Sequence, residues 1–442
     1  MKKNEEYIVH CIDDTDQAFG VAKVDEQVVF IPDFLIGEKA RIRIVKVCKT
    51  YAFGKVMELL ESSKDRTEPL CKVNRLCGGC QLQYMSYEAE LSLKHRQLKK
   101  LANRTLKREV EVRPVKGMEE PLYYRNKAQF PVQIIDGEVQ IGFYRLHSHD
   151  IVECEACLIQ NPVIQELYRC IKENITVSQA KGLRHIMIRY AQSTHQIQLV
   201  WIGSTCNDWC SIHAILNQKF GPLASIVFNK NTRKDNVILG NEYQVLQGSD
   251  SIIETCMGNK VQLHFKSFFQ VNPTMMEVLY QSAIDAANLK KHMTCIDMYS
   301  GTGTIGMAIS KYVDQVIGVE IVKEAVDNAK INAKMNGISN CEFECQDASE
   351  FVKEYKEAQK KADVVMIDPP RKGMSSQGIL DVSALNPEKI VYVSCNPHTL
   401  VRDLVLFEDK GYTCLYIQPV DMFSQTMNLE SVALLIKKQR LD

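Results

Sequence analysis

The sequence predicts an α/β protein whose C-terminal part forms a doubly wound sheet, preceded by a small β-barrel and a mainly β region. From residue 268 onward, apolar strands alternate with amphipathic helices, which is typical of a parallel sheet. Strands dominate residues 123–261, and residues 7–60 contain short strands separated by turns. A chain of 442 residues has room for about three domains. We place them at 1–62, 63–262 and 263–442.

Composition and charge indicate a globular protein of a reducing compartment. The 54 basic and 54 acidic residues cancel, so the chain is not coated with positive charge for general nucleic-acid binding. No apolar run reaches membrane-spanning length and no signal peptide is visible, so we expect a cytoplasmic protein without a membrane partner. In that compartment the 16 cysteines should be thiols, which makes metal binding and catalysis the roles to examine.

The N-terminal region predicts a small barrel of the oligonucleotide-binding kind. Its strands are expected at 7–10, 20–24, 27–31, 40–47 and 52–56. The fourth strand alternates basic and aliphatic residues, as expected when one face is exposed and the other buried. The placing of Gly20, Pro32 and Gly37-Glu38 resembles that of a TRAM domain, and this resemblance implies an RNA-binding barrel.

A helix is expected at about 86–113, after a polar linker and three closely spaced cysteines. Leucines recur near helical spacing, and Pro114 and Gly117 end the pattern. Between Lys94 and Arg108 there are seven basic residues and no acidic one. This basic face has two interpretations, contact with phosphates or simple solvation. The helix itself could pack on the C-terminal domain.

The central region predicts a mixed, mainly antiparallel fold. Strands are expected at 127–134, 140–144, 185–190 and 196–202, with one amphipathic helix at 161–174. Tyr124-Arg125-Asn126-Lys127 and Phe143-Tyr144-Arg145 interleave aromatic and basic side chains, a pattern that suits unpaired RNA. Core or surface roles are equally compatible with these two segments.

The C-terminal region has the strand–helix order of a Rossmann-like sheet, which binds ligands beyond the carboxyl ends of its strands. Strands are expected at 293–299, 315–319, 341–345, 363–367, 390–395, 412–419 and 431–436. The clearest helix covers 323–336 and ends at Gly337. The first strand runs into a glycine-rich loop, Gly301-Thr302-Gly303, whose backbone can approach a ligand closely.

Acidic residues at the ends of these strands favour a nucleoside cofactor. Glu320 ends the second strand and can accept both ribose hydroxyls. A dinucleotide and S-adenosylmethionine both fit that feature. Polar Asp297, Tyr299 and Ser300 in the loop, together with Asp347 and Asp368 after the third and fourth strands, favour S-adenosylmethionine.

Cys395 lies at the carboxyl end of the buried strand expected at 390–395, and Pro397, two residues further on, stops strand pairing. A thiol at the carboxyl end of a core strand is a candidate nucleophile. Taken alone, it could equally be a small buried hydrophobic residue.

At Asp368-Pro369-Pro370-Arg371 and Ser394-Cys395-Asn396-Pro397 the sequence resembles the RNA uracil-5 methyltransferase family. The likeness covers nearly the whole chain and is strongest to bacterial members that modify 23S ribosomal RNA and carry a TRAM domain and an iron–sulfur cluster. It implies transfer of a methyl group from S-adenosylmethionine to C5 of a uridine, giving 5-methyluridine. The substrate uridine would lie in a loop or be flipped out of a duplex, because a paired base could not reach the pocket.

The resemblance also implies roles for single residues. Gln270, Tyr299, Glu320 and Asp368 would contact S-adenosylmethionine, Cys395 would be the nucleophile and Glu430 the base. Thiolate addition at C6 makes uracil nucleophilic at C5, and a base must later remove the C5 proton so that the thiolate can leave. The family usually has a histidine two residues before this glutamate, whereas this chain has Asn428. We therefore expect Glu430 to act without a neighbouring imidazole.

The clustered cysteines suit a [4Fe–4S] cluster, as in the family. Cys71, Cys77 and Cys80 are three expected ligands, with Gly78-Gly79 allowing close approach of the backbone. Cys154 and Cys157 are both candidates for the fourth, and the family pattern of a cysteine before two aliphatic residues matches Cys157. Zinc on four thiolates is the competing interpretation.

Two alternative functions stay open at this point. One is methylation of transfer RNA, which the barrel and the cysteine cluster make a weaker match. The other is an RNA-binding ribosome-assembly factor with an inactive methyltransferase domain. Nothing in the sequence identifies protein partners, the oligomeric state or the modified uridine.

Overall fold

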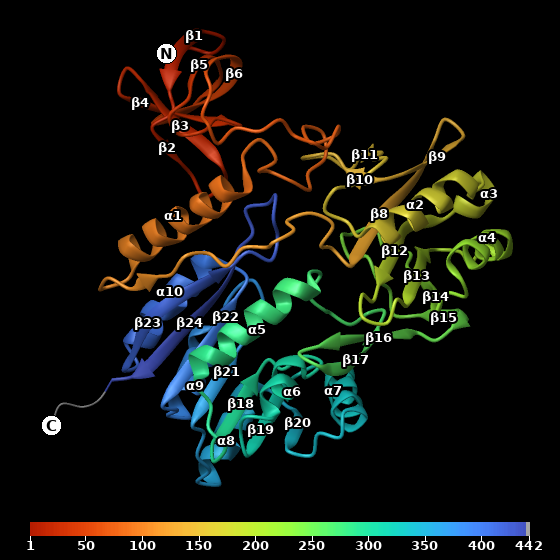
Figure 1. The fold of residues 1–442 in the computed structure, drawn as a ribbon, viewed down its shortest axis with the longest axis vertical. Coiled ribbons are helices and arrows are strands. Elements are labelled where there is room, and N and C mark those ends of the chain that lie inside the picture. Colours follow the sequence, from red (N-terminus) through yellow and green to blue (C-terminus); the bar gives the residue numbers. More distant parts are fainter. Residues whose placement is uncertain (439–442) are drawn as a thin grey trace.

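The computed structural model describes residues 1–438, which form a small barrel, a central β region and a larger α/β domain (Figure 1). The predicted order of barrel, β region and doubly wound domain is confirmed. The barrel lies at one end of the molecule, and the helix α1 lies between it and the α/β domain (Figure 1).

The N-terminal barrel contains one six-stranded sheet in the order β1-β5-β6-β4-β3-β2. Its strands are β1 (Glu6–His10), β2 (Asp13–Asp14), β3 (Phe19–Val24), β4 (Gln27–Pro32), β5 (Lys39–Val47) and β6 (Tyr51–Glu61). In β5 the aliphatic residues Ala40, Ile42 and Ile44 are buried, while the basic residues between them face outward, as the alternating pattern predicts. Apolar side chains from all the longer strands fill the barrel interior.

The helix α1 (Tyr87–Thr105) is shorter than the predicted range of about 86–113. It begins after Ser86, whose hydroxyl caps it by accepting the Ala89 N–H. At Leu106 the backbone becomes extended and the leucine is buried in the core of the α/β domain. The chain then forms β7 (Glu111–Val112), which pairs with the edge strand of the α/β sheet. This long-range pairing outweighs the local helical pattern.

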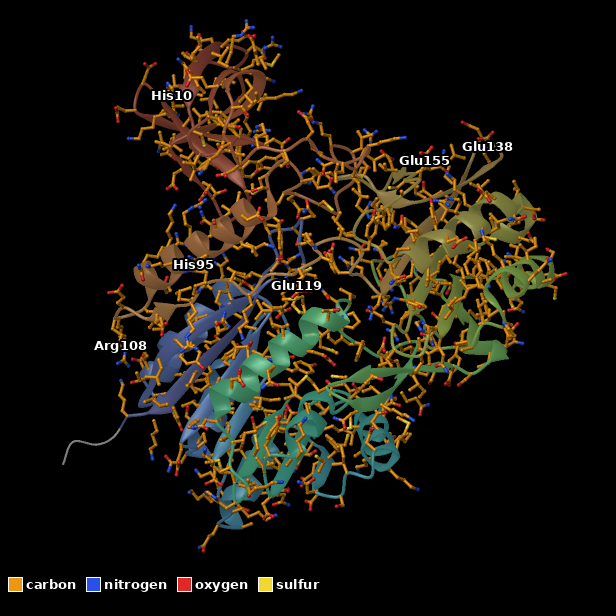
Figure 2. All side chains as sticks on the ribbon, viewed as in Figure 1. His10, His95, Arg108, Glu119, Glu138 and Glu155 are labelled. Atoms are coloured by element: carbon orange, nitrogen blue, oxygen red, sulfur yellow. The ribbon has the colours of Figure 1, made fainter. Side chains whose placement is uncertain are left out.

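The basic face of α1 mostly contacts other parts of the same chain. Lys94 is fully buried, and Arg96 and Lys100 pair with Asp14 and Asp13 of the barrel. Beyond the helix, Lys107 pairs with Asp409. Arg108, which follows the end of α1 in Figure 2, lies 3.5 Å from Glu408. All five residues thus have acidic partners within the chain, while the side chains of Arg96, Lys100, Lys107 and Arg108 stay 42–59% exposed.

The central region is built on a six-stranded sheet in the order β15-β14-β13-β12-β8-β9, with a separate pair β10-β11. The strands are β8 (Lys127–Ile135), β9 (Glu138–Ile141), β10 (Phe143–Tyr144), β11 (Ile151–Val152), β12 (Leu183–Tyr190), β13 (Ile197–Gly203), β14 (Ser225–Lys230) and β15 (Tyr243–Gly248). The helices are α2 (Pro162–Asn174), α3 (Val177–Ala180) and α4 (Cys210–Phe220). Residues of α2 and α4 share one hydrophobic core with the sheet, and the rings of Trp201 and Trp209 stack within it at 4.9 Å.

The hairpin β16 (Ser251–Cys256) and β17 (Asn259–His264) follows this sheet in sequence but packs elsewhere. Its Val261 and Leu263 share a core with Met276 and Leu279 of the α/β domain. The hairpin therefore packs as part of the α/β domain, although our division of the sequence put most of it in the central domain.

The α/β domain has an eight-stranded sheet in the order β20-β19-β18-β21-β22-β24-β23-β7. Its strands are β18 (Thr294–Met298), β19 (Gln315–Glu320), β20 (Cys341–Cys345), β21 (Val364–Ile367), β22 (Lys389–Ser394), β23 (Tyr412–Val420) and β24 (Glu430–Lys437). Its helices are α5 (Pro273–Ala287), α6 (Thr304–Ser310), α7 (Lys323–Met335), α8 (Ala348–Glu357), α9 (Ser376–Ala384) and α10 (Pro397–Glu408). Helices α5, α6 and α7 pack on one face, and α8, α9, α10 and α1 pack on the other.

All 16 cysteines are free thiols in the structure. Between residues 1 and 438, no helix is both long enough and apolar enough to cross a membrane.

We predict that Asp14→Ala loosens the barrel from α1. The Asp14 carboxylate accepts hydrogen bonds from Arg96 and Gln97, and its side chain is only 10% exposed. Losing hydrogen bonds to a charged group typically costs about 1.5–3 kcal/mol. Hydrogen exchange should show faster exchange in the barrel and unchanged protection in the α/β domain. Glu61→Ala is the control, since its exposed pair with Lys39 should contribute no more than about 1 kcal/mol. Equal effects of the two substitutions would contradict the prediction.

Candidate active site and cysteine cavity

A cleft of about 1110 Å³ opens at the carboxyl ends of the parallel strands of the α/β domain. It is large enough for a nucleoside cofactor and a nucleotide together. Its lining includes all six residues predicted for the active site: Gln270, Tyr299, Glu320, Asp368, Cys395 and Glu430. The structure therefore brings these residues, which span 160 positions of sequence, to one place.

The sheet topology explains why Cys395 and Glu430 line the same end of the cleft. Cys395 directly follows β22, and Asn396 then caps α10. β24 runs antiparallel to β22, with Ser431 opposite Ser394. Glu430, the first residue of β24, therefore lies beside the carboxyl end of β22.

Burial favours the neutral forms of three acidic groups in the cleft, Cys395, Glu430 and Asp368. Burial raises the pKa of the Cys395 thiol to about 11, and the Glu430 and Asp368 carboxylates add to the shift. Burial, helped by the charge of Asp368, raises the pKa of Glu430 to about 8. Burial alone raises the pKa of Asp368 to about 7. Near neutral pH, Cys395 is thus a thiol and not a thiolate.

Arg371 is a residue of the cleft for which the sequence alone indicated no role. Its guanidinium donates to the Asn428 side-chain oxygen at 3.0 Å. Its positive charge lowers the pKa of both Cys395 and Glu430, partly opposing burial. Arg371 belongs to the same motif as Asp368, and this proximity in sequence was the signal that could have identified it.

The glycine-loop side of the cleft has groups suited to a nucleoside. The Glu320 carboxylate accepts the N–H groups of Gly301 at 3.1 Å and Val322 at 2.9 Å. The Ser300 hydroxyl is buried and has no hydrogen-bond partner among the described residues, so it is available to a ligand. Tyr299 has a φ of 66°, an uncommon value for a residue other than glycine and one often found at binding sites.

Close packing restricts the glycine loop at Gly303. Its φ is +78°, and a Cβ atom there would lie 2.6 Å from the Phe343 ring. Only glycine fits this position without moving the ring. The packing holds the loop tightly between its sheet and α7.

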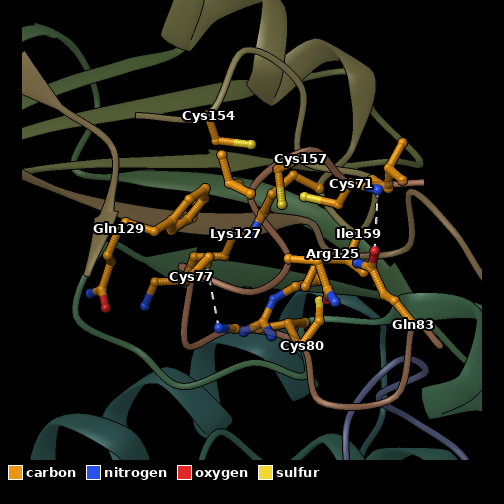
Figure 3. A pocket seen from close by; sticks show the side chains of 18 of the residues that line it. Cys71, Cys77, Cys80, Gln83, Arg125, Lys127, Gln129, Cys154, Cys157 and Ile159 are labelled. Carbon is orange, nitrogen blue, oxygen red and sulfur yellow. Dashed lines mark hydrogen bonds between the residues drawn. The ribbon is translucent and has the colours of Figure 1, made fainter. Parts of the chain in front are cut away.

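A second cavity, of about 350 Å³, is lined by the sulfur-bearing residues Cys71, Cys77, Cys80, Cys154 and Cys157 (Figure 3). Arg125 and Lys127 also line it, and no carboxylate does among the described residues. Neither side chain has an ion pair or a side-chain hydrogen bond within residues 1–438, and the Arg125 Nε is buried without a partner. Burial, together with the charges of Arg189 and Arg125, lowers the pKa of Lys127 to about 7. The cavity therefore favours an anionic occupant.

Four of the five cysteines of this cavity have raised pKa values, whereas a hydrogen bond with Cys154 lowers the pKa of Cys71 to about 6. Burial raises the pKa of Cys80 to about 12 and that of Cys157 to about 11. The Gly79 N–H donates to the Cys77 sulfur at 3.4 Å. In the described part of the chain, no three His, Cys, Asp or Glu side chains are arranged to hold a metal ion. A metal group would have to draw the cysteines together and deprotonate them.

Alternate residues of the segment 124–127 have different contacts. The Tyr124 hydroxyl donates to the Ser424 carbonyl at 3.1 Å, and the Asn126 amide donates to the Gln270 carbonyl at 3.3 Å. These two residues thus connect the central region to the α/β domain. Arg125 and Lys127 line the cysteine cavity between those contacts.

The fold and the cleft together define an α/β methyltransferase preceded by a barrel. The TRAM domain model matches residues 3–57, and the model of the family described as tRNA (Uracil-5-)-methyltransferase matches residues 86–438. The chain therefore belongs to the tRNA (uracil-5-)-methyltransferase family and is an S-adenosylmethionine-dependent RNA methyltransferase.

Relatives of similar length support this assignment. The chain is 41% identical to an RNA methyltransferase of Clostridium acetobutylicum, with 98% of each chain covered. It is 39% identical to one of Clostridium tetani, with 98% of this chain and 97% of the relative covered. Among solved structures, it resembles the Pyrococcus abyssi tRNA (uracil-54, C5)-methyltransferase in complex with S-adenosyl-L-homocysteine. That match has a TM-score of 0.74 and 25% identity, and covers 97% of this chain and 99% of the other.

Proposed function

We propose that this protein methylates C5 of a uridine in 23S ribosomal RNA through a covalent bond between Cys395 and C6 of the base. The observation that carries the proposal is the shared cleft of Cys395 and Glu430 at the ends of adjacent antiparallel strands. A nucleophile and a base are both needed for this reaction, and an inactive RNA-binding factor would need neither.

The cofactor contacts in this proposal come from four residues. Gln270, Tyr299, Glu320 and Asp368 hold S-adenosylmethionine, which supplies the electrophilic methyl group when bound. The unpartnered Ser300 hydroxyl and the carboxylate of Glu320 are suited to the polar groups of this cofactor. Asp368 and Cys395 close the same cleft at the end where the uracil ring would react.

Cys395 and Glu430 then act in sequence. Cys395 gives up its proton to solvent water as its sulfur attacks C6, because its pKa of about 11 leaves few thiolates beforehand. The electrons of the C5–C6 double bond move into the ring as an enolate, whose C5 then takes the methyl group as the bond from that group to the cofactor sulfur breaks. After methylation, the Glu430 carboxylate takes the proton from C5. The electrons of that C–H bond form the C5–C6 double bond, and the C6–S bond breaks to release the Cys395 thiolate.

We predict that Glu430→Gln accumulates a covalent RNA–protein adduct, because an amide cannot take the C5 proton. Cys395→Ala should form no adduct but still bind the cofactor.

In the parent enzyme, Glu430 is a base only when it is ionised. Because burial raises its pKa to about 8, we expect adduct resolution to become faster as the pH rises toward and past 8. The measurement is the rate at which the adduct band disappears on denaturing gels at pH values from about 6 to 9. Normal turnover of the glutamine variant without adduct would refute the assignment of the base.

We further propose that Cys71, Cys77, Cys80 and Cys157 hold a [4Fe–4S] cluster. A cluster on four thiolates is anionic, and Arg125 and Lys127 at the same cavity suit that charge. In such a cluster each of the four thiolates would bind an iron atom, whereas zinc would need all four on one ion. Cys154 lines the cavity too and is the alternative fourth ligand.

We expect protein purified without oxygen to be brown, with about four iron atoms and four sulfides per chain. Cys157→Ser should lose most of this iron, and Cys154→Ser should keep it. The opposite order would exchange the two assignments. A colourless protein with one zinc ion per chain would overturn the iron assignment.

The RNA substrate needs a direct test, because one observation favours transfer RNA. The Pyrococcus abyssi transfer RNA enzyme matches 97% of this chain, so the presence of the barrel does not by itself favour ribosomal RNA. Mass mapping of both RNAs from a strain lacking the protein separates the two substrates. We expect loss of a 5-methyluridine from 23S ribosomal RNA and unchanged transfer RNA. Loss from transfer RNA alone would make this a transfer RNA enzyme.

A further inference from the structure

The loop at 421–429 carries the chain from β23 into Glu430, and it is unusually buried. Asp421, Met422 and Ser424 have no exposed surface, and Thr426 has 2%. Connecting loops normally run over the surface, since a buried loop must satisfy every backbone polar group internally. A buried loop beside a proposed base therefore indicates a segment whose position matters.

The loop is held most firmly at Gln425. Its N–H donates to both carboxylate oxygens of Glu90 on α1, at 2.9 and 3.0 Å. Its carbonyl accepts the N–H groups of Gln81 at 2.8 Å and Leu82 at 3.1 Å. Gln425 has a φ of 66°, a left-handed value that a residue with a side chain adopts only when its surroundings impose it.

Glu90 is itself fixed by buried charges. Lys94, one turn along α1, donates to Glu90 at 2.6 Å and to Asp421 at 2.7 Å. The Tyr87 hydroxyl donates to the second oxygen of Asp421 at 2.7 Å. The side chains of Glu90, Lys94 and Asp421 are at most 1% exposed. Both the first residue of the loop and its strained residue are therefore held by one face of α1.

Buried ion pairs add little net stability, because the cost of removing charges from water offsets their attraction. They do fix geometry, since each partner has only one place where its hydrogen bonds are satisfied. The side chain of Glu90 lies outside the set of residues that line the cleft. Its hydrogen bonds to Gln425 connect it to the loop that ends at Glu430.

We propose that Glu90 is a positioning residue for Glu430, acting through its bonds to Gln425. This inference rests on the proposed function, in which the Glu430 carboxylate takes the C5 proton, the C–H electrons form the C5–C6 double bond, and the C6–S bond breaks. A general base must be held within hydrogen-bonding distance of the proton that it removes. Displacing a catalytic group by about 1 Å can cost roughly 100-fold in rate.

The test follows the formation and the resolution of the adduct separately in single-turnover reactions with RNA and cofactor. We expect Glu90→Ala to form adduct at a rate within about twofold of the parent and to resolve it about 10–100-fold more slowly. Glu90→Asp is the second variant, because it keeps the charge that balances Lys94 but withdraws the carboxylate by about one C–C bond, roughly 1.5 Å. It should fold and still resolve the adduct about tenfold more slowly.

Glu88→Ala is the matched control, since Glu88 lies on the same turn of α1 but is exposed. It should form and resolve the adduct as the parent does. Resolution at the parental rate in both Glu90 variants would overturn the inference, and so would equal slowing of formation and resolution, which indicates general damage to the fold. A parent protein that forms no adduct with any RNA would instead refute the proposed function.

Discussion

The antiparallel pairing of β24 with β22 is the constraint on which the proposed chemistry depends. Five parallel strands, from β20 to β22, direct their carboxyl ends toward the cleft, and Cys395 follows the last of them. Because β24 runs the other way, its first residue and not its last reaches the same edge. In a parallel arrangement Glu430 would lie at the far edge of the sheet, about 20 Å away for a strand of six residues. The reversal of one strand thus places a carboxylate beside a thiol.

Helix α1 explains how the parts of the molecule are held around that edge. One of its faces packs through Leu98, Leu101 and Ala102 on the core of the α/β domain. Its charges reach in two other directions, through Arg96 and Lys100 to the barrel and through Glu90 and Lys94 to the loop at 421–429. Directly after Cys80, the backbone N–H groups of Gln81 and Leu82 donate to the Gln425 carbonyl of the same loop. The segment that follows Cys80 and the loop that ends at Glu430 are therefore hydrogen-bonded to each other.

The parts of this structure that the sequence predicted are those set by local patterns. Alternating and apolar runs located the strands, and the shared edge of a parallel sheet brought Tyr299, Glu320, Asp368 and Cys395 into one cleft. The predictions that were wrong depend on contacts between residues far apart in the sequence. The helix at 86–113 ends early because Glu111–Val112 pairs with β23, some 300 residues away. The basic residues between 94 and 108 have no acidic partner close by in the sequence. Their partners Asp13, Asp14, Asp409 and Asp421 lie far from them along the chain. The bond between Arg371 and Asn428 joins residues 57 positions apart, so no local pattern records it.

The pKa values of the acidic groups in the cleft depend on burial and on nearby charge. Burial raises the pKa values of Asp368 and Glu430 to about 7 and 8, and the charge of Arg371 opposes the shift at Glu430 and at Cys395. A positive charge brought into such a cleft lowers the pKa of each nearby acid. S-adenosylmethionine carries that charge on its sulfonium, and the product left after methyl transfer does not. In the proposed reaction, bound S-adenosylmethionine would thus favour the ionised forms of Cys395 and Glu430, and the uncharged product would not. Burial and the charge of the methyl donor would then act in opposite directions on the same two groups.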